Sequence, residues 1–165
     1  MKKLIFISLL FWGSITFSQT TVPDDTSSVD KMISAMYNVI SGPAGQRDWK
    51  RFKNLFSSTA DMGAIYKNIE GYEIYQSFSS DDYIKSNDPY FLKNGFIEKE
   101  IHRTTNTYGH LVNVFTTYEY ESGKEKARGI NSLQLIYIAN RWYIASLIWL
   151  EETPENLIPE GFLPK

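Results

Sequence analysis

Side chains that could perform acid–base chemistry are few and widely spaced in this chain. There are two histidines, His102 and His110, and no cysteine, which excludes thiol catalysis and cysteine-ligated metal sites. Asp61 stands at the start of a short apolar segment, and His102 lies within a stretch rich in strand-forming residues. General acid–base catalysis needs such a group beside the reacting atom. Asp61 and His102 are therefore the two candidates for a catalytic base.

The same residues also have a simpler explanation as surface groups. In an alternating strand, His102 would share one face with Glu98 and Glu100, where polar side chains can be exposed to solvent. The paired acids Asp81-Asp82 and Glu151-Glu152 fit a helix start and a strand end. The sequence has no His-x-His or Glu-x-x-His spacing, no Gly-x-Ser-x-Gly motif and no glycine-rich phosphate loop. It therefore predicts no metal site and no cofactor.

Helices are predicted in the first part of the chain. Apolar residues recur at helical spacing between Val29 and Ile40, and the breakers at positions 42–45 would end that helix. Asp48 is the expected N-cap of a second helix. A third helix is expected to start at positions 79–82, where hydroxyl and acidic residues are dense, and Pro89 would keep it short or kinked.

Strands are predicted over most of the remaining chain. Two short strands, at 61–66 and 71–77, precede the third helix, and four long strands follow it between residues 97 and 150. The last two flank Ala139-Asn140-Arg141, which predicts a closing β-hairpin with Asn140 at positive φ. Early helices and a late strand meander indicate an α+β fold, with helices packed on one face of a curved sheet.

The final strand of that hairpin is apolar on both faces. An antiparallel strand with one solvated face should alternate between apolar and polar residues, and this strand does not. Strict alternation places Trp142 on the face toward the helices and a second apolar set on the other face. A homodimer formed through the sheet would cover that second face. The residues expected to form the dimer surface are Tyr143, Leu147 and Trp149.

The N-terminus has the pattern of a signal peptide: two lysines, an apolar run from Leu4 to Phe17, and small residues before Gln19. The run is too short for a comfortable membrane span, although an uncleaved anchor helix is the alternative. Without cysteine the chain cannot carry a lipoprotein anchor, so we expect an exported protein, periplasmic or secreted, with no membrane attachment after cleavage. The expected parts are the signal peptide 1–18, a flexible linker 19–27, one domain 28–152, and a C-terminal tail 153–165 packed on the domain.

Three segments carry a resemblance to a known superfamily. They are DWKRFKNLFSSTADM (48–62), YGHLVNVFTTYEYES (108–122) and RGINSLQLIYIANRWYIASLIW (128–149). Their order and spacing resemble nuclear transport factor 2-like domains, which include polyketide-cyclase-like and ketosteroid-isomerase-like members. The resemblance implies a cone-shaped α+β barrel, in which a curved mixed or antiparallel sheet wraps round N-terminal helices and leaves a pocket. Dimerisation through the sheet is common in the superfamily.

Two positions depart from the superfamily pattern. His110 stands where an acid is usual, and Asn140 replaces the usual glycine of the hairpin turn. The acid–base residues of the enzymatic members have no motif in this sequence, so the resemblance carries no activity over. It does imply a cavity wall with phenol and indole groups, which suits a small hydrophobic ligand unless the rings fill the core. The residues expected to line this cavity are Tyr37, Tyr66, Tyr118 and Trp142.

Two functions follow from these expectations. The first is a non-catalytic module that binds a small ligand or another protein. The second is a cyclase-, isomerase- or hydratase-like enzyme for a small apolar substrate, with Asp61 or His102 as base and Tyr118 as hydrogen-bond donor. The enzyme requires its base in the same cavity as Tyr118, shielded from bulk water. A formal net charge of −2, with no long run of one sign, argues against nucleic acid as the main partner.

Overall fold

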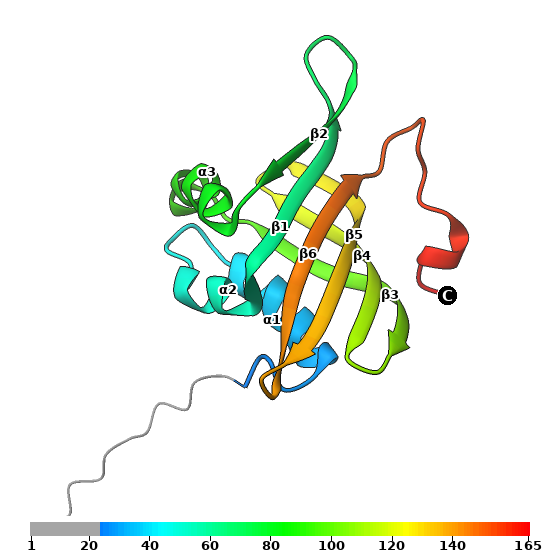
Figure 1. Cartoon of the computed structure of the whole chain (residues 1–165). Helices are drawn as coiled ribbons and strands as arrows, with labels where there is room; N and C mark the ends of the chain where they lie inside the picture. Colours follow the sequence, from blue (N-terminus) through cyan, green and yellow to red (C-terminus); the bar gives the residue numbers. More distant parts are fainter. Residues whose placement is uncertain (1–23) are drawn as a thin grey trace, which may run out of the picture.

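A curved, six-stranded mixed sheet with helices on its concave side forms the body of the molecule (Figure 1). The computed structural model describes residues 24–165, so the predicted signal peptide and positions 19–23 of the predicted linker lie outside the described residues. The elements run in the order α1 (Val29–Ile40), α2 (Trp49–Leu55), β1 (Phe56–Lys67), β2 (Glu73–Phe78), α3 (Ser80–Lys93), β3 (Ile97–Tyr108), β4 (Leu111–Ser122), β5 (Glu125–Ile138), β6 (Arg141–Glu151) and the 3₁₀ turn η1 (Glu160–Phe162).

Each of the three α-helices begins at a side-chain cap. Ser28 and Asp48 each accept a hydrogen bond from the backbone N–H three residues on, which satisfies a donor that the helix leaves free. Ser79 and Asp82 form a complete capping box at the start of α3. Pro89 lies inside α3, which continues past it to Lys93, so the proline does not shorten this helix. No helix in residues 24–165 is long and apolar enough to cross a membrane.

The strands are ordered β2-β1-β6-β5-β4-β3 in the sheet. All neighbours are antiparallel except β1 and β6, which are parallel. In the described residues no ladder joins β2 to β3, so the sheet stays open. The closing hairpin turns at Ala139 and Asn140, with φ of 49° and 61°. The predicted α+β class and the curved mixed sheet round N-terminal helices are confirmed.

A β-bulge in β6 changes which residues face the helices. The pairing of β6 with β5 jumps from Ile144 to Ser146, which leaves Ala145 as an extra residue. Side chains before and after a bulge follow opposite alternation. The prediction of one shared dimer face is therefore wrong, because Leu147 and Trp149 face the concave side with the core. Of the three predicted residues, only Tyr143 lies on the outer face of the strand.

A second bulge, in β3, separates His102 from the two acids that precede it. The pairing with β4 jumps between Glu100 and His102. His102 is thereby paired with Thr117, whose hydroxyl donates to the carbonyl of Phe162 on the convex side, at 2.6 Å. Glu98 and Glu100 face the concave side. The expected common face of His102, Glu98 and Glu100 is therefore wrong.

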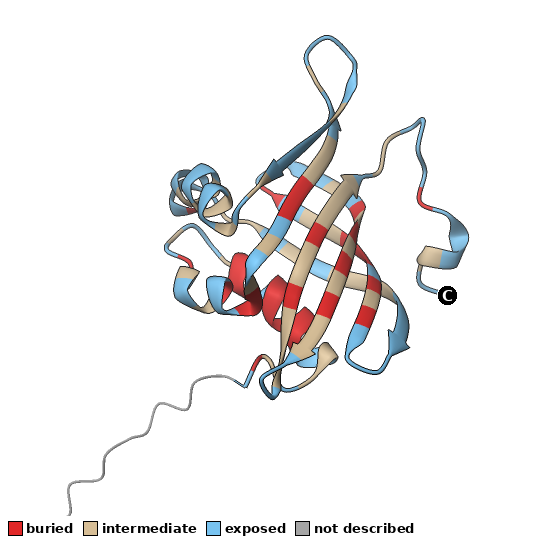
Figure 2. Cartoon of the chain, in the orientation of Figure 1, coloured by how far each residue is buried: buried red, intermediate tan, exposed pale blue. Residues whose placement is uncertain are grey.

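The core lies between α1 and the concave face of the sheet (Figure 2). Met32 and Ile33 of α1 are fully buried, as are Leu133 and Leu135 of β5. Burial on this scale supplies the main driving force for a domain without disulfides. The chain between the helices is held to this core by Arg47, whose guanidinium donates to four backbone carbonyls.

Both ends of the described chain pack on the domain. Asp25 is 9% exposed and accepts two hydrogen bonds from Arg51, at 2.7 and 2.9 Å. Residues 24–27, which the sequence assigns to a flexible linker, are therefore part of the folded unit. At the other end, the tail covers part of the convex face, where the ring of Phe162 lies 5.7 Å from that of Phe115.

Candidate functional site

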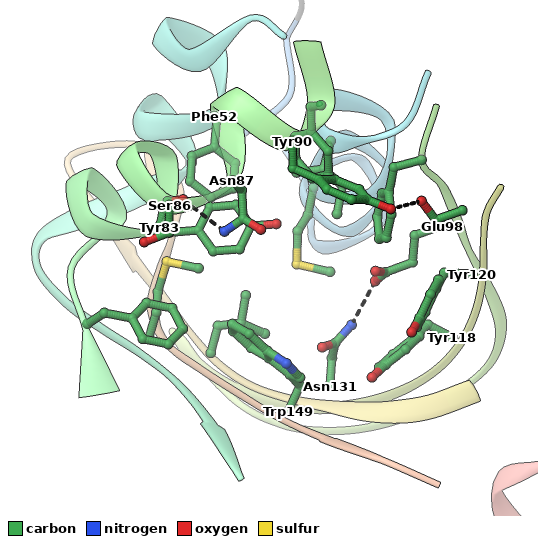
Figure 3. A pocket seen from close by; sticks show the side chains of 18 of the residues that line it. Phe52, Tyr83, Ser86, Asn87, Tyr90, Glu98, Tyr118, Tyr120, Asn131 and Trp149 are labelled. Atoms are coloured by element: carbon green, nitrogen blue, oxygen red, sulfur yellow. Dashed lines mark hydrogen bonds between the residues drawn. The ribbon is translucent and has the colours of Figure 1, made fainter. Parts of the chain in front are cut away.

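A cavity of about 550 Å³ lies between α3, the end of α1 and the concave face of the sheet (Figure 3). The sheet does not close, and α3 lies over its open end. Side chains from both helices and strands therefore form the wall of the cavity. Aromatic rings form a large part of that wall. The rings come from α2, α3 and four strands or their ends: Phe52, Phe78, Tyr83, Tyr90, Phe91, Phe96, Tyr118, Tyr120 and Trp149.

Glu98 is the carboxyl at the inner wall of the cavity. It lies at the start of β3, and the backbone there is fixed to the end of α1 by Ser41. The Ser41 hydroxyl donates to the carbonyl of Glu98 and accepts from its N–H, both at 2.9 Å. Burial raises the pKa of the Glu98 carboxyl to about 7, although a hydrogen bond from Asn131 opposes the shift. Both protonation states are therefore accessible near neutral pH.

Asn131 connects this carboxyl to the first helix. Its side-chain Nδ2 donates to Oε1 of Glu98 at 3.4 Å and to the hydroxyl of Tyr37 at 3.1 Å. The Tyr37 hydroxyl is in turn hydrogen-bonded to that of Thr116 on β4. A buried polar network with its partners in place fixes side-chain orientation. The cavity thus has a carboxyl of defined position on its inner wall.

Tyr118 contributes a hydroxyl without a protein partner among residues 24–165. The side chain is 4% exposed and lines the cavity. Gly129 lies opposite it on β5, where a Cβ would come within 2.3 Å of the Tyr118 hydroxyl oxygen. Only glycine leaves room for the phenol to lie across this strand. Burial and the nearby Glu98 and Glu151 raise the pKa of Tyr118, so it stays a neutral hydrogen-bond donor.

Further carboxylates surround the cavity. Tyr120 donates to Glu125 at 3.2 Å and to Glu151 at 3.4 Å, and burial raises the pKa of Glu151. Asp82, from the first turn of α3, also lines the cavity. No lysine, arginine or histidine of the described chain does so. In residues 24–165 no three histidine or acidic side chains are grouped closely enough to hold a metal ion.

Comparison with solved structures identifies the fold of this chain. A protein of Streptomyces avermitilis from the NTF2-like family, provisionally described as a dehydratase, matches 76% of this chain and 94% of its own with a TM-score of 0.57 and 11% identity. The chain has the nuclear transport factor 2-like fold. The resemblance inferred from sequence is confirmed at the level of the fold.

Two further structures share the nuclear transport factor 2-like architecture of this chain. The beta subunit of a proposed aromatic-ring-hydroxylating dioxygenase of Novosphingobium aromaticivorans matches 77% of this chain and 88% of its own, with a TM-score of 0.59 and 11% identity. A protein of unknown function from Nostoc punctiforme with a cystatin-like fold matches 76% and 90%, with a TM-score of 0.57 and 6% identity. Identities this low show the fold alone. No protein-family model and no curated protein matches the chain.

The two predicted bases of this nuclear transport factor 2-like domain lie outside the cavity. Asp61 is exposed on the convex side, where its carboxylate accepts from Tyr75 at 2.9 Å and from Ser77 at 2.7 Å. His102 is on the convex side as well, because of the bulge in β3. Neither residue can act as the base of a reaction in the cavity with Tyr118.

Of the four predicted ligand contacts, Tyr118 lines the cavity. Tyr37 lies behind Asn131, one hydrogen bond from the wall. Tyr66 is exposed and donates to Gln76 at 2.6 Å. Trp142 faces inward but packs on Tyr137 near the hairpin turn, at the opposite end of β6 from the cavity.

Sequence reasoning missed Glu98 and Asn131. Asn131 is 5% exposed, and it interrupts an apolar strand with a side chain that needs a buried partner. That interruption was the available signal for a polar site. Glu98 had none, because alternation with neighbouring lysine and acidic residues is equally typical of an exposed strand.

Proposed function

We propose that this domain binds a small, partly apolar organic molecule in the cavity between α3 and the sheet. The observation that carries the proposal is the cavity itself, about 550 Å³, whose wall combines aromatic rings with polar side chains. Cavities of roughly 300–1,000 Å³ with this kind of wall are typical of small-molecule sites. The fold supports many functions, so the argument depends on the site.

A cavity-filling variant tests the proposal. Ser86 lies on α3 and lines the cavity, whereas the neighbouring Lys85 is exposed and does not line it. Fragment binding is measured by ligand-observed NMR on residues 19–165. We expect fragments that bind the wild type and Lys85→Trp to lose binding to Ser86→Trp. Equal binding to all three proteins would place the fragments elsewhere and contradict the proposal.

The second candidate is an acid–base enzyme that uses Glu98 in place of the predicted Asp61 and His102. The raised pKa of Glu98, about 7, suits a group that both takes and gives a proton near neutral pH. Tyr118, neutral and without a protein partner, is the matching hydrogen-bond donor for a developing negative charge. A Glu98→Gln variant that keeps ligand binding but loses all turnover supports the enzyme. Turnover that survives this substitution excludes it.

Export is also proposed, on the signal-peptide pattern of residues 1–18. Expression of the whole chain in a bacterial host tests it by the mass and compartment of the product. We expect a processed protein that begins at Gln19 and leaves the cytoplasm. A full-length product in the cytoplasm would contradict export.

A further inference from the structure

The carboxylates that line the cavity differ from their neighbours in lacking counterions. Four acids line it: Asp82, Glu98, Glu125 and Glu151. In the described part of the chain none of these four forms an ion pair. Four acids outside the cavity, on or next to β3, β4 and β6, do form ion pairs: Glu100 with Arg103, Glu119 with Lys99, Glu121 with Lys126 and Glu152 with Arg128.

The lack of cationic partners is confined to the cavity. The whole chain has 17 lysines and arginines against 19 aspartates and glutamates, a nearly even count. The cationic group held behind the aromatic wall is Arg47, 5.1 Å from the ring of Phe91, and its guanidinium is occupied by four backbone carbonyls. A cavity with four acids and no basic side chain has a negative potential that low-dielectric walls strengthen.

The aromatic rings also contribute to the negative potential of the cavity. Trp149 packs against Phe78 and Tyr83 with centroids 5.3 and 6.3 Å apart, and Tyr120 stacks on Phe96 at 5.4 Å. Ring faces carry negative charge and attract cations, indole most strongly. Aromatic walls and carboxylates together therefore favour a ligand with a positive group on an apolar body.

Two polar groups on the wall still have hydrogen-bonding capacity to offer. Tyr118 is 4% exposed and its hydroxyl has no partner in residues 24–165. The only side chain that donates to the Glu98 carboxyl in that range is Asn131, at a long 3.4 Å. A buried carboxyl with one weak donor gains most from a ligand that brings a positive charge or N–H groups.

We propose that the cavity binds a small organic cation, an amine or quaternary ammonium on an apolar body, with its positive group toward Glu98 and its body against the aromatic wall. This inference rests on the proposed binding function and names its ligand class.

Binding of such a cation should depend on pH through Glu98. A positive charge beside the carboxyl favours its ionised form, so affinity should rise as pH increases through about 7. The groups that face Glu98 are Tyr37 from α1, Tyr83 from α3, Tyr118 and Tyr120 from β4, and Asn131 from β5. The four tyrosines have raised pKa values and stay neutral over this range.

Three probes with one aromatic body test the charge preference: 2-phenylethylammonium, 2-phenylethanol and phenylacetate. Affinities are measured by NMR titration on residues 19–165 at pH 6 and pH 8. We expect the cation to bind about tenfold more tightly than either other probe at pH 8, with a smaller advantage at pH 6. Glu98→Gln should remove most of that advantage and leave the alcohol unaffected. The control is Glu119→Gln, which removes a carboxylate outside the cavity.

The possible failures are distinguishable. Equal affinity for the three probes, with all binding lost in Ser86→Trp, would overturn the cation preference and leave the binding function intact. Tighter binding of phenylacetate, or no binding of the cation at millimolar concentration, would also overturn it. A cation preference that persists unchanged in Glu98→Gln would overturn the role given to this residue.

Discussion

Glu98 shows how one partly buried side chain links folding to the site. Ser41 fixes its backbone and Asn131 donates to its carboxyl, which has no cationic partner among the described residues. Burial raises its pKa from 4.5 to about 7. The folded state therefore binds this proton more tightly than the unfolded state. The resulting stabilisation is full below pH 4.5 and is lost as pH rises through about 7.

Replacement of Glu98 by glutamine should remove this pH dependence. A shift from 4.5 to about 7 corresponds to about 3 kcal/mol at most in the free energy of unfolding. We expect Glu98→Gln to gain up to that amount relative to wild type between pH 5 and pH 8, measured by denaturant unfolding. Glu119→Gln, on the outer face, is the matched control. Parallel pH curves for wild type and Glu98→Gln would show that this carboxyl is not desolvated.

A second prediction concerns the replacement of a single residue, Gly129. A Cβ at this position would lie 2.3 Å from the Tyr118 hydroxyl oxygen and 2.6 Å from the backbone oxygen of Leu150. Because the strand backbone cannot move freely, Gly129→Ala should lower the free energy of unfolding by about 1–3 kcal/mol. Gly161→Ala meets no atom within 4 Å and should change it by less than about 0.5 kcal/mol. Thermal and denaturant unfolding of both variants measure the difference, and equal stability would refute the steric argument.

At the scale of helices and strands, a local sequence pattern predicts some features of the structure and misses others. The helix caps and the positive φ of Asn140 are local properties, and the structure has them as predicted. The bulges are not visible in the sequence, because a small residue such as Ala145 fits either face of a strand. The start of β1 was also missed. Positions 57–60 suit a helix end, but the structure includes them in β1, in the irregular stretch between the Phe56–Ile144 and Asp61–Ser146 pairs.

The bulge in β6 predicts an order of stability for two adjacent residues. Leu147 is 6% exposed on the concave side, whereas Ile148 is half-buried on the convex side. Leu147→Ala should cost about 2–4 kcal/mol of unfolding free energy, and Ile148→Ala less than about 1.5. Denaturant unfolding of the two variants gives the comparison. The opposite order would mean that the strand alternates without interruption, as the sequence predicts.

For the whole molecule, the order of elements and the fold could be predicted, and the site largely could not. Tyr118 was predicted because the resemblance to nuclear transport factor 2-like domains implies a cavity that it lines. Glu98 and Asn131 meet Tyr118 only because three strands and α1 converge in the folded chain. Such a site depends on contacts between residues far apart in sequence, and no local spacing records them.

The last prediction concerns the convex face of the sheet. The C-terminal tail covers part of this face, where Phe162 meets Phe115 and accepts from Thr117, and half-buried apolar residues of β5, β6 and β1 lie on the same face. Ile130 and Leu150 pair side by side there, next to Ile65, and Ile148 lies on the same face. We propose a homodimer through this surface, in place of the predicted face of Tyr143, Leu147 and Trp149.

Ile148→Glu should convert that dimer to a folded monomer. An unpaired charge in an apolar interface costs about 2–5 kcal/mol, while the half-exposed position in the monomer tolerates it. Size-exclusion chromatography with light scattering at micromolar concentration measures the mass, and circular dichroism checks the fold. Lys124→Glu, in the exposed β4–β5 turn, should remain dimeric. A monomeric wild type would exclude this interface, and the half-buried isoleucines would then be ordinary surface residues, since isolated apolar side chains are common on monomers.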